Sequence, residues 1–402
     1  MLENKTKDNR LSQRQKTAFK FIILMGVVSL LGDVVYEGAR SITAPYLYLL
    51  GASALIVSVV AGAGEFVGYA LRLLTGYLSD KTKSYWAITI VGYGLICSIP
   101  LLAFAGNWQT ACLLIIIERL GKAIRSPARD VILSNVTSQV GRGLGFGIHE
   151  AMDQVGAIIG PLFFSLILIM NAGYREGFWF LWIPAILCVV VLLFARKMVP
   201  APEVYETADK HNNESVHLKI IPSVFRLYIL FTILTVSSFV NFPLIAYHAK
   251  AHSIISDIQI PLFYVVAMGV DALVAILVGR IYDRVGLTTL AIIPVLSIMV
   301  PCFAFSNNSN FILVSAVLWG AVMGIHETVM RAAIADMAPI QKRGFVYGIF
   351  NTAYGFSFFI AGVVLGVIYT FGVFSIFLYA ALLQIASFLV LLRLRSRLTF
   401  DK

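Results

Sequence analysis

The sequence predicts an all-α polytopic membrane protein with twelve transmembrane helices, arranged as two pseudo-symmetric six-helix bundles. Three observations lead to this fold class. Apolar runs long enough to cross a bilayer recur along the whole chain, one long polar segment divides them into two sets of six, and short motifs of the first set recur in the second.

The composition excludes a water-soluble fold. Of the 402 residues, 59% are hydrophobic and only 13% are charged, whereas about 25% of a soluble domain is charged. An α-helix needs about 20 apolar residues to cross the hydrocarbon core, and it satisfies its own backbone hydrogen bonds there. The predicted spans are 21–49, 53–78, 86–105, 109–133, 146–170, 177–195, 225–248, 260–279, 287–305, 311–334, 345–370 and 373–392.

The basic residues predict the orientation. With twelve spans both termini lie on one side, and twenty-one of the 31 Lys and Arg residues fall on that side, whereas the opposite loops contain only Arg175 and Lys250. By the positive-inside rule the basic side is cytoplasmic. The net charge of +10 is therefore a topology signal, and nucleic acid is not an expected partner.

The polar stretch in the middle of the chain predicts the domain division. It contains Pro-Ala-Pro-Glu and His-Asn-Asn-Glu-Ser, which are typical of a solvated linker. The predicted units are a cytoplasmic N-terminal tail at 1–20, an N-terminal six-helix bundle at 21–196, a cytoplasmic linker at 197–222, and a C-terminal six-helix bundle with a short cytoplasmic tail at 223–402.

An internal repeat supports two related halves. R-G-L-G-F-G-I at Arg142–Ile148 matches R-G-F-V-Y-G-I at Arg343–Ile349, and G-Y-L-S-D-K-T-K at Gly76–Lys83 matches G-R-I-Y-D-R-V-G at Gly279–Gly286. Duplicated bundles are common in transporters, whose substrate site lies between the repeats near the bilayer midplane. The duplication favours a transporter over a membrane enzyme or a receptor.

The loop between the second and third spans resembles the signature loop of the major facilitator superfamily, because Gly76, Asp80 and Lys83 are spaced by four and three. The second half repeats the aspartate at Asp283, followed by Arg284. The resemblance implies the fold of that family and makes these five residues part of a lock that braces cytoplasmic closure of the halves. The alternative is that the charges only mark loop ends.

Two further stretches resemble members of this superfamily. Gly156–Pro161 is similar to the glycine-proline motif of drug–proton antiporters, although Phe164 and Ser165 replace its second glycine pair. Glu118–Asp130 is similar to the charged fourth helix of bacterial efflux members, without the expected glutamine. This resemblance implies export. The alternative is that the small residues of the fifth span only allow close helix packing.

Ionisable residues within the spans are candidate functional groups, since each costs at least about 2.5–3.5 kcal/mol near the bilayer centre and needs a partner or a watery cavity. The first span places Asp33, Glu37 and Arg40 on one helical face. One arginine cannot neutralise two carboxylates, so at least one of them needs another cation or a proton. We therefore expect proton coupling or a central cavity here.

The second, fourth and fifth spans contain similar groups. Glu65 and Arg72 share one face, with a structural salt bridge as the alternative. In the fourth span, Glu118, Arg119 and Lys122 are predicted to be cavity or coupling groups, whereas Arg125, Arg129 and Asp130 are expected to form ion pairs of the inner gate. The fifth span adds Glu150 and Asp153 as partners for arginines, and the second half aligns the uncharged Asn351 and Tyr354 with them.

The sequence predicts neither a metal site nor a cofactor. The four cysteines lie in apolar runs without C-x-x-C spacing, and His211 and His217 of the linker have no cysteine or close carboxylate beside them. No nucleophile motif or phosphate-binding loop indicates an enzyme.

The leading hypothesis is a secondary transporter of a small solute that works by alternating access in a bacterial inner membrane, with both termini cytoplasmic. Protonation of a carboxylate among Asp33, Glu37, Glu65 and Glu118 would shift the balance between the two states, and export is preferred over import. The expected partners are a small-molecule substrate, protons and the lipid bilayer, and the chain is expected to function as a monomer. The alternatives are an uncoupled facilitator and a non-transporting membrane sensor that uses the charge cluster as a ligand switch.

Overall fold

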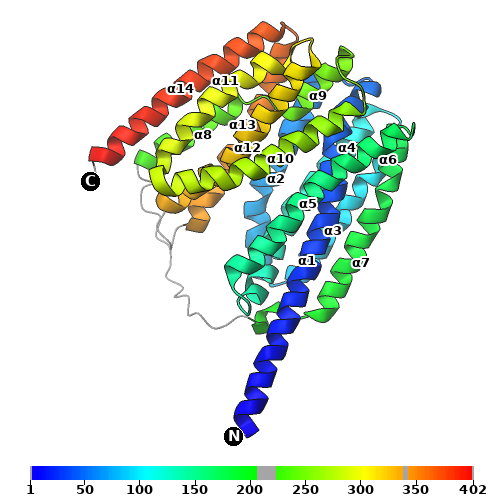
Figure 1. Ribbon diagram of the computed structural model, residues 1–402, viewed down its shortest axis with the longest axis vertical. Helices are drawn as coiled ribbons and strands as arrows, with labels where there is room; N and C mark the ends of the chain where they lie inside the picture. The colour runs from blue at the N-terminus through cyan, green and yellow to red at the C-terminus, as the bar shows by residue number, and fades with distance from the viewer. Residues whose placement is uncertain (1, 206–222, 338–342, 401–402) are drawn as a thin grey trace.

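The computed structural model describes residues 2–205, 223–337 and 343–400, and the side chains within them except at 2–12, 142–143, 223, 335–336, 343–345 and 398–400. Most of the predicted linker, including His211 and His217, lies outside the described residues. The N-terminal half consists of the following helices: α1 (Leu2–Leu49), α2 (Ala54–Thr82), α3 (Tyr85–Gly94), α4 (Trp108–Thr137), α5 (Arg142–Ile169), α6 (Tyr174–Phe180) and α7 (Trp182–Met198) (Figure 1).

The C-terminal half follows the same plan. Its helices are α8 (Ser223–Ser237), α9 (Phe242–Ala251), α10 (Gln259–Val285), α11 (Ile292–Ala304), α12 (Ser309–Met337), α13 (Arg343–Tyr369) and α14 (Val373–Phe400). Short 3-10 turns extend some of them: Leu95–Ser98 and Pro100–Phe104 follow α3, Pro202–Tyr205 follows α7, and Gly286–Ala291 precedes α11.

The helices confirm the predicted all-α membrane fold. In the described chain, ten segments are long and apolar enough to cross a membrane. One of them, Gln259–Ala304, has 46 residues, which as a single helix would measure about 69 Å, more than twice the hydrocarbon thickness. It is interrupted at Gly286, where φ is +60°, so it accounts for two crossings.

The charged helix α4 provides the remaining crossing. Its 30 residues are long enough to span a membrane. The charged residues from Glu118 to Asp130 interrupt its apolar sequence, so α4 is not one of the ten apolar segments. Neighbouring helices bury or partly bury these charges except Asp130, which is exposed. The described residues thus support twelve crossings, and an even number returns the chain to its starting side.

We call the side on which α1 begins and α14 ends the terminal side, and the opposite side the distal side. Figure 1 shows the helices of the two halves lying close together on the distal side and diverging toward the terminal side. The helix pairs that join the halves include α2 with α13, α5 with α10, and α1 with α9. The basic residues predict that the terminal side is cytoplasmic.

The glycine-proline stretch of α5 packs against α1 inside the N-terminal half. A Cβ atom added at Gly160 would lie 2.6 Å from the backbone nitrogen of Gly38 and 2.6 Å from the carbonyl oxygen of Val34. One added at Gly156 would lie 2.5 Å from the carbonyl oxygen of Leu30. The small residues therefore permit backbone contact between two helices of the same half, as they do at many membrane helix pairs.

We expect Gly160→Ala to destabilise the N-terminal half by about 1–3 kcal/mol, because the new methyl group meets backbone that cannot move aside. The thermal unfolding of the purified protein measures this effect. Gly147→Ala on the same helix is the matched control, since a Cβ atom there meets nothing within 4 Å. Equal stability of the two variants would contradict the packing role.

Candidate solute and coupling site

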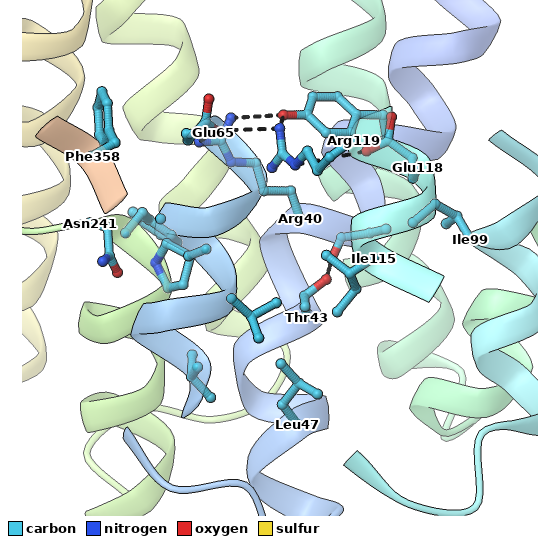
Figure 2. Close-up of a pocket in the computed structure, with 18 of the residues that line it drawn as sticks. Arg40, Thr43, Leu47, Glu65, Ile99, Ile115, Glu118, Arg119, Asn241 and Phe358 are labelled. Atoms are coloured by element: carbon cyan, nitrogen blue, oxygen red, sulfur yellow. Dashed lines mark hydrogen bonds and ion pairs between the residues drawn. The ribbon is translucent and has the colours of Figure 1, made fainter. Parts of the chain in front are cut away.

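A layer of buried charges lies between the two halves at the middle of α1, α2 and α4. We call it the charged layer, and it contains three carboxylates and three cations: Glu37, Glu65, Glu118, Arg40, Arg119 and Lys122. Arg40 Nη2 donates to Glu65 Oε1 at 2.9 Å, and Arg119 Nη1 lies 3.3 Å from the same oxygen. Figure 2 shows Arg40, Glu65 and Arg119 meeting at one end of a cavity.

Tyr36 of α1 organises the cations of this layer. Arg119 Nη1 donates to its hydroxyl, and Arg40 Nη1 donates to the same oxygen at 3.2 Å. The ammonium of Lys122 lies 3.9 Å from the centre of the Tyr36 ring, a favourable position for a cation over an aromatic face. One aromatic side chain thereby holds three like charges in place.

Glu37 connects the charged layer to the other half of the protein. Its Oε1 lies 3.7 Å from Arg40 Nη1, and its Oε2 accepts a hydrogen bond of 2.6 Å from the hydroxyl of Tyr264 on α10. The carboxylate is only 8% exposed. Tyr264 lies in an apolar run, where no motif or charge marks it as a functional residue.

Glu118 and Arg125 pair along one face of α4. Glu118 is 1% exposed, with Arg125 Nη1 at 3.7 Å and Arg119 Nε at 3.8 Å from its oxygens. Arg129, in contrast, pairs with the adjacent Asp130 at 2.8 Å. In this conformation the structure brings none of Arg125, Arg129 and Asp130 into an ion pair with the described part of the C-terminal half, so their role in an inner gate stays a prediction.

A cavity of about 50 Å³ lies on the distal side of the charged layer. Its walls are mainly apolar, whereas Arg40, Glu65, Glu118 and Arg119 form one end (Figure 2). The other lining residues include Leu47, Val57, Ile99, Ile115, Phe242, Trp319 and Phe358. Such a surface suits a solute with an apolar body and a polar end.

Two polar cavities lie on the other side of the layer. A middle cavity of about 60 Å³ shares Arg40 and Glu65 with the distal one. An inner cavity of about 290 Å³ shares Tyr69, Arg72 and Lys122 with the middle one. Asp33, Glu150 and Asp153 also line the inner cavity, which reaches solvent beside the exposed Asp130.

The two uncharged candidates of the second half occupy different places. Tyr354 is buried, and its ring packs against Tyr69 of the other half with centroids 5.1 Å apart. Asn351 lies on the same helix, and neither Tyr354 nor Asn351 lines any of these three cavities. Their role as contact residues stays a prediction.

The distal side is closed by contacts between the halves. Asn241 Nδ2 donates to Ser58 Oγ at 2.9 Å, and the rings of Tyr48 and Tyr247 pack edge to face with centroids 5.4 Å apart. Next to them α2 and α13 are in backbone contact, since a Cβ atom at Gly62 would lie 2.5 Å from the carbonyl oxygen of Phe358. These contacts hold the two halves together on the distal side.

The predicted lock on the terminal side is not engaged in this conformation. Asp80, Lys83, Asp283 and Arg284 are exposed, and in the described chain none of them forms an ion pair. Gly76 faces Pro127 of α4 at an ordinary contact distance. The lock residues therefore stay a prediction for the opposite state.

Two related helix bundles that enclose buried charges and are closed on one side of a membrane define a secondary transporter of small solutes. The model of the Major Facilitator Superfamily matches residues 30–294 and 227–399. The chain belongs to the Major Facilitator Superfamily, as the loop at Gly76 to Lys83 predicted. It is thus a multi-pass membrane transporter.

Relatives cover nearly the whole chain. An uncharacterized protein of Mycobacterium tuberculosis is 39% identical over 383 residues, which are 94% of each chain. An uncharacterized MFS-type transporter of Methanocaldococcus jannaschii is 28% identical and covers 97% of this chain and 98% of its own. The multidrug resistance protein MdtH of Proteus mirabilis is 23% identical over 56% of this chain and 55% of its own.

Solved structures share the fold. The nucleoside transporter NupG superposes with a TM-score of 0.71 over 94% of this chain and 98% of its own, at 13% identity. The peptide transporter POT superposes with a TM-score of 0.70 over 93% of each chain, also at 13% identity. At this identity the likeness shows the fold alone.

Proposed function

We propose that this transporter couples the export of a small solute to proton entry across a bacterial inner membrane, as a monomer with both termini in the cytoplasm. The observation that carries the proposal is the position of Arg40 between two carboxylates, at 2.9 Å from Glu65 and 3.7 Å from Glu37. Arg119 also lies 3.3 Å from Glu65, so Glu37 has the weaker ionic contact and is the carboxylate that we propose to accept the proton.

The contact between Glu37 and Tyr264 links this proton to conformation. It joins α1 to α10 across the two halves at 2.6 Å. A hydrogen bond to an ionised carboxylate is about twice as strong as one between neutral groups. Protonation of Glu37 therefore weakens one of the contacts that hold the halves together, and it favours their separation on the distal side.

Export is supported by two resemblances. The glycine-proline stretch of α5 is similar to that of drug–proton antiporters, and one relative is named a multidrug resistance protein. The largely apolar distal cavity also suits an amphipathic solute. With the basic terminal side in the cytoplasm, the conformation described here is open inward and ready to take a solute from inside.

Proton movement in liposomes tests the proposal. Purified protein is reconstituted with an entrapped pH-sensitive dye, a proton gradient is imposed, and pools of solutes are screened for substrate-dependent proton movement. We expect Glu37→Gln to abolish this movement while solute exchange continues, whereas Arg196→Gln, an exposed change on α7, leaves both intact. Solute flux without proton movement in the unchanged protein would identify an uncoupled facilitator, and binding without flux would identify a sensor.

Tyr264→Phe isolates the contact between the halves. It removes only the hydroxyl that donates to Glu37, so a charged hydrogen bond worth about 1.5–3 kcal/mol is lost. We expect coupled transport to fall about tenfold or more, with solute binding unchanged. A transport rate equal to that of the unchanged protein in the same liposome assay would show that this contact does not govern the conformational step.

A further inference from the structure

The inner cavity contains balanced charges that its own side chains leave mostly unpaired. Five cations and five carboxylates line it: Arg72, Lys122, Arg125, Arg129, Arg331, Asp33, Asp130, Glu150, Asp153 and Glu327. Among these ten described residues the only ion pair is that of Arg129 with Asp130. Opposite charges that share one cavity without contact are available to a ligand that carries both signs.

Two of the cations that line the cavity come from opposite halves and lie near the same tyrosine. Arg72 of α2 and Arg331 of α12 are each among the charged neighbours of Tyr69. The guanidinium of Arg72 lies 4.9 Å from the Tyr69 ring, and its Nε is buried without a hydrogen-bond partner in the described chain. Like charges repel across the cavity, so an anionic group between them would relieve the repulsion and join the halves.

Two carboxylates of the cavity lie close to each other. The carboxylates of Asp33 on α1 and Asp153 on α5 are close enough to repel each other. One oxygen of Asp153 is buried without a partner among the described residues. The cation with the largest electrostatic influence on Asp33 is Lys122, whose ammonium lies over the ring of Tyr36. A protonated amine placed between Asp33 and Asp153 would compensate both carboxylates.

Two buried side chains of the same cavity each have a polar atom without a hydrogen-bond partner, although Arg125 also lies 3.7 Å from Glu118. His149 and Arg125 are each 3% exposed, and both line the cavity. His149 Nε2 and Arg125 Nη1 have no hydrogen-bond partner in the described chain. Unsatisfied buried polar atoms cost about 1–3 kcal/mol each, so polar atoms of a bound ligand would be stabilising here.

We propose that the inner cavity is a binding site for a small zwitterion of amino-acid to dipeptide size. Its acidic group lies between Arg72 and Arg331, and its ammonium group lies against Asp33 and Asp153. This inference rests on the proposed transport function and names the substrate class. Because the acidic group bridges α2 and α12, binding draws the two halves together on the terminal side.

Equilibrium binding in nanodiscs, without any gradient, tests this inference. The probes are L-leucine and L-leucyl-L-leucine, each with its N-acetyl, methyl-ester and doubly blocked derivatives. We expect at least one of the two zwitterions to bind, and each blocked charge to lower its affinity at least about tenfold, or about 1.4 kcal/mol. Arg72→Gln should abolish the preference for the zwitterion over its methyl ester. Asp153→Asn should abolish the preference for the zwitterion over its N-acetyl form.

The comparison of ligands within each variant separates binding chemistry from folding defects. Arg196→Gln should keep both preferences. The inference is overturned if neither zwitterion binds. It is also overturned if the doubly blocked form, or either singly blocked form, binds as tightly as the zwitterion. Zwitterion binding without proton movement in liposomes overturns proton coupling alone, so failure of the two proposals is distinguishable.

Discussion

Glu65→Gln is expected to reduce coupled transport at least about 100-fold, or about 2.7 kcal/mol. Glu65 is the shared acceptor of Arg40 at 2.9 Å and Arg119 at 3.3 Å. Removing its charge leaves two buried cations with one fewer carboxylate, and breaking such a pair typically costs about 3–5 kcal/mol. The liposome assay with the entrapped pH dye measures the rate, and thermal unfolding measures the stability.

A double variant separates coupling from stability. Glu65→Gln with Arg119→Gln removes one charge of each sign, so we expect stability to recover most of the loss while transport stays low. The coupling energy between the two sites comes from the cycle of the single and double variants. Recovery of transport along with stability would mean that Glu65 only balances charge in the fold.

Gly62→Ala is expected to prevent closure of the distal side. The added methyl group would lie 2.5 Å from the carbonyl oxygen of Phe358 and 3.0 Å from the Cα of Phe359. Because both neighbours are backbone atoms of α13, the two helices must separate. Overpacking costs about 1–3 kcal/mol, and this cost destabilises only the conformation that is closed on the distal side. We therefore expect transport to fall at least about tenfold.

Cysteine labelling measures this closure directly. Val57 is 2% exposed in the distal-closed state, so a Val57→Cys variant of a chain without its four native cysteines should react slowly with an impermeant maleimide. Labelling should become at least about tenfold faster when Gly62→Ala is added. Gly68→Ala, on the same helix with nothing within 4 Å of its Cβ position, should leave the rate unchanged. Slow labelling in both variants would refute the steric argument.

The crossings could be predicted from sequence because a bilayer imposes one length and one polarity on every span. The sequence predicts even the charged fourth span, at 109–133, although hydrophobicity alone does not identify it as a membrane helix. The structure places α4 at Trp108–Thr137. The spacing of these charges also indicates one stripe, on which Glu118 and Arg125 pair at 3.7 Å. Local periodicity determines such features.

The partners across helices could not be predicted in the same way. The shortage of cations beside Asp33 and Glu37 is visible in the first span, but the sequence does not say that Arg40 turns to Glu65 or that Tyr264 contacts Glu37. That last pair is separated by 227 positions, and tyrosine in an apolar run is usually a packing residue. Tyr36, four residues before Arg40, is a stronger signal, since this spacing places the two on one helical face.

In the proposed proton-coupled cycle, the equal numbers of opposite charges in the charged layer determine the electrical character of transport. Three carboxylates and three cations sum to zero, so a bound proton adds a charge that nothing in the layer offsets, and a zwitterion adds none. The proton-loaded form then senses the membrane potential, which contributes about 2.3 kcal/mol per elementary charge at 100 mV. A cell could drive this protein with voltage as well as with pH, even where the two sides have the same acidity.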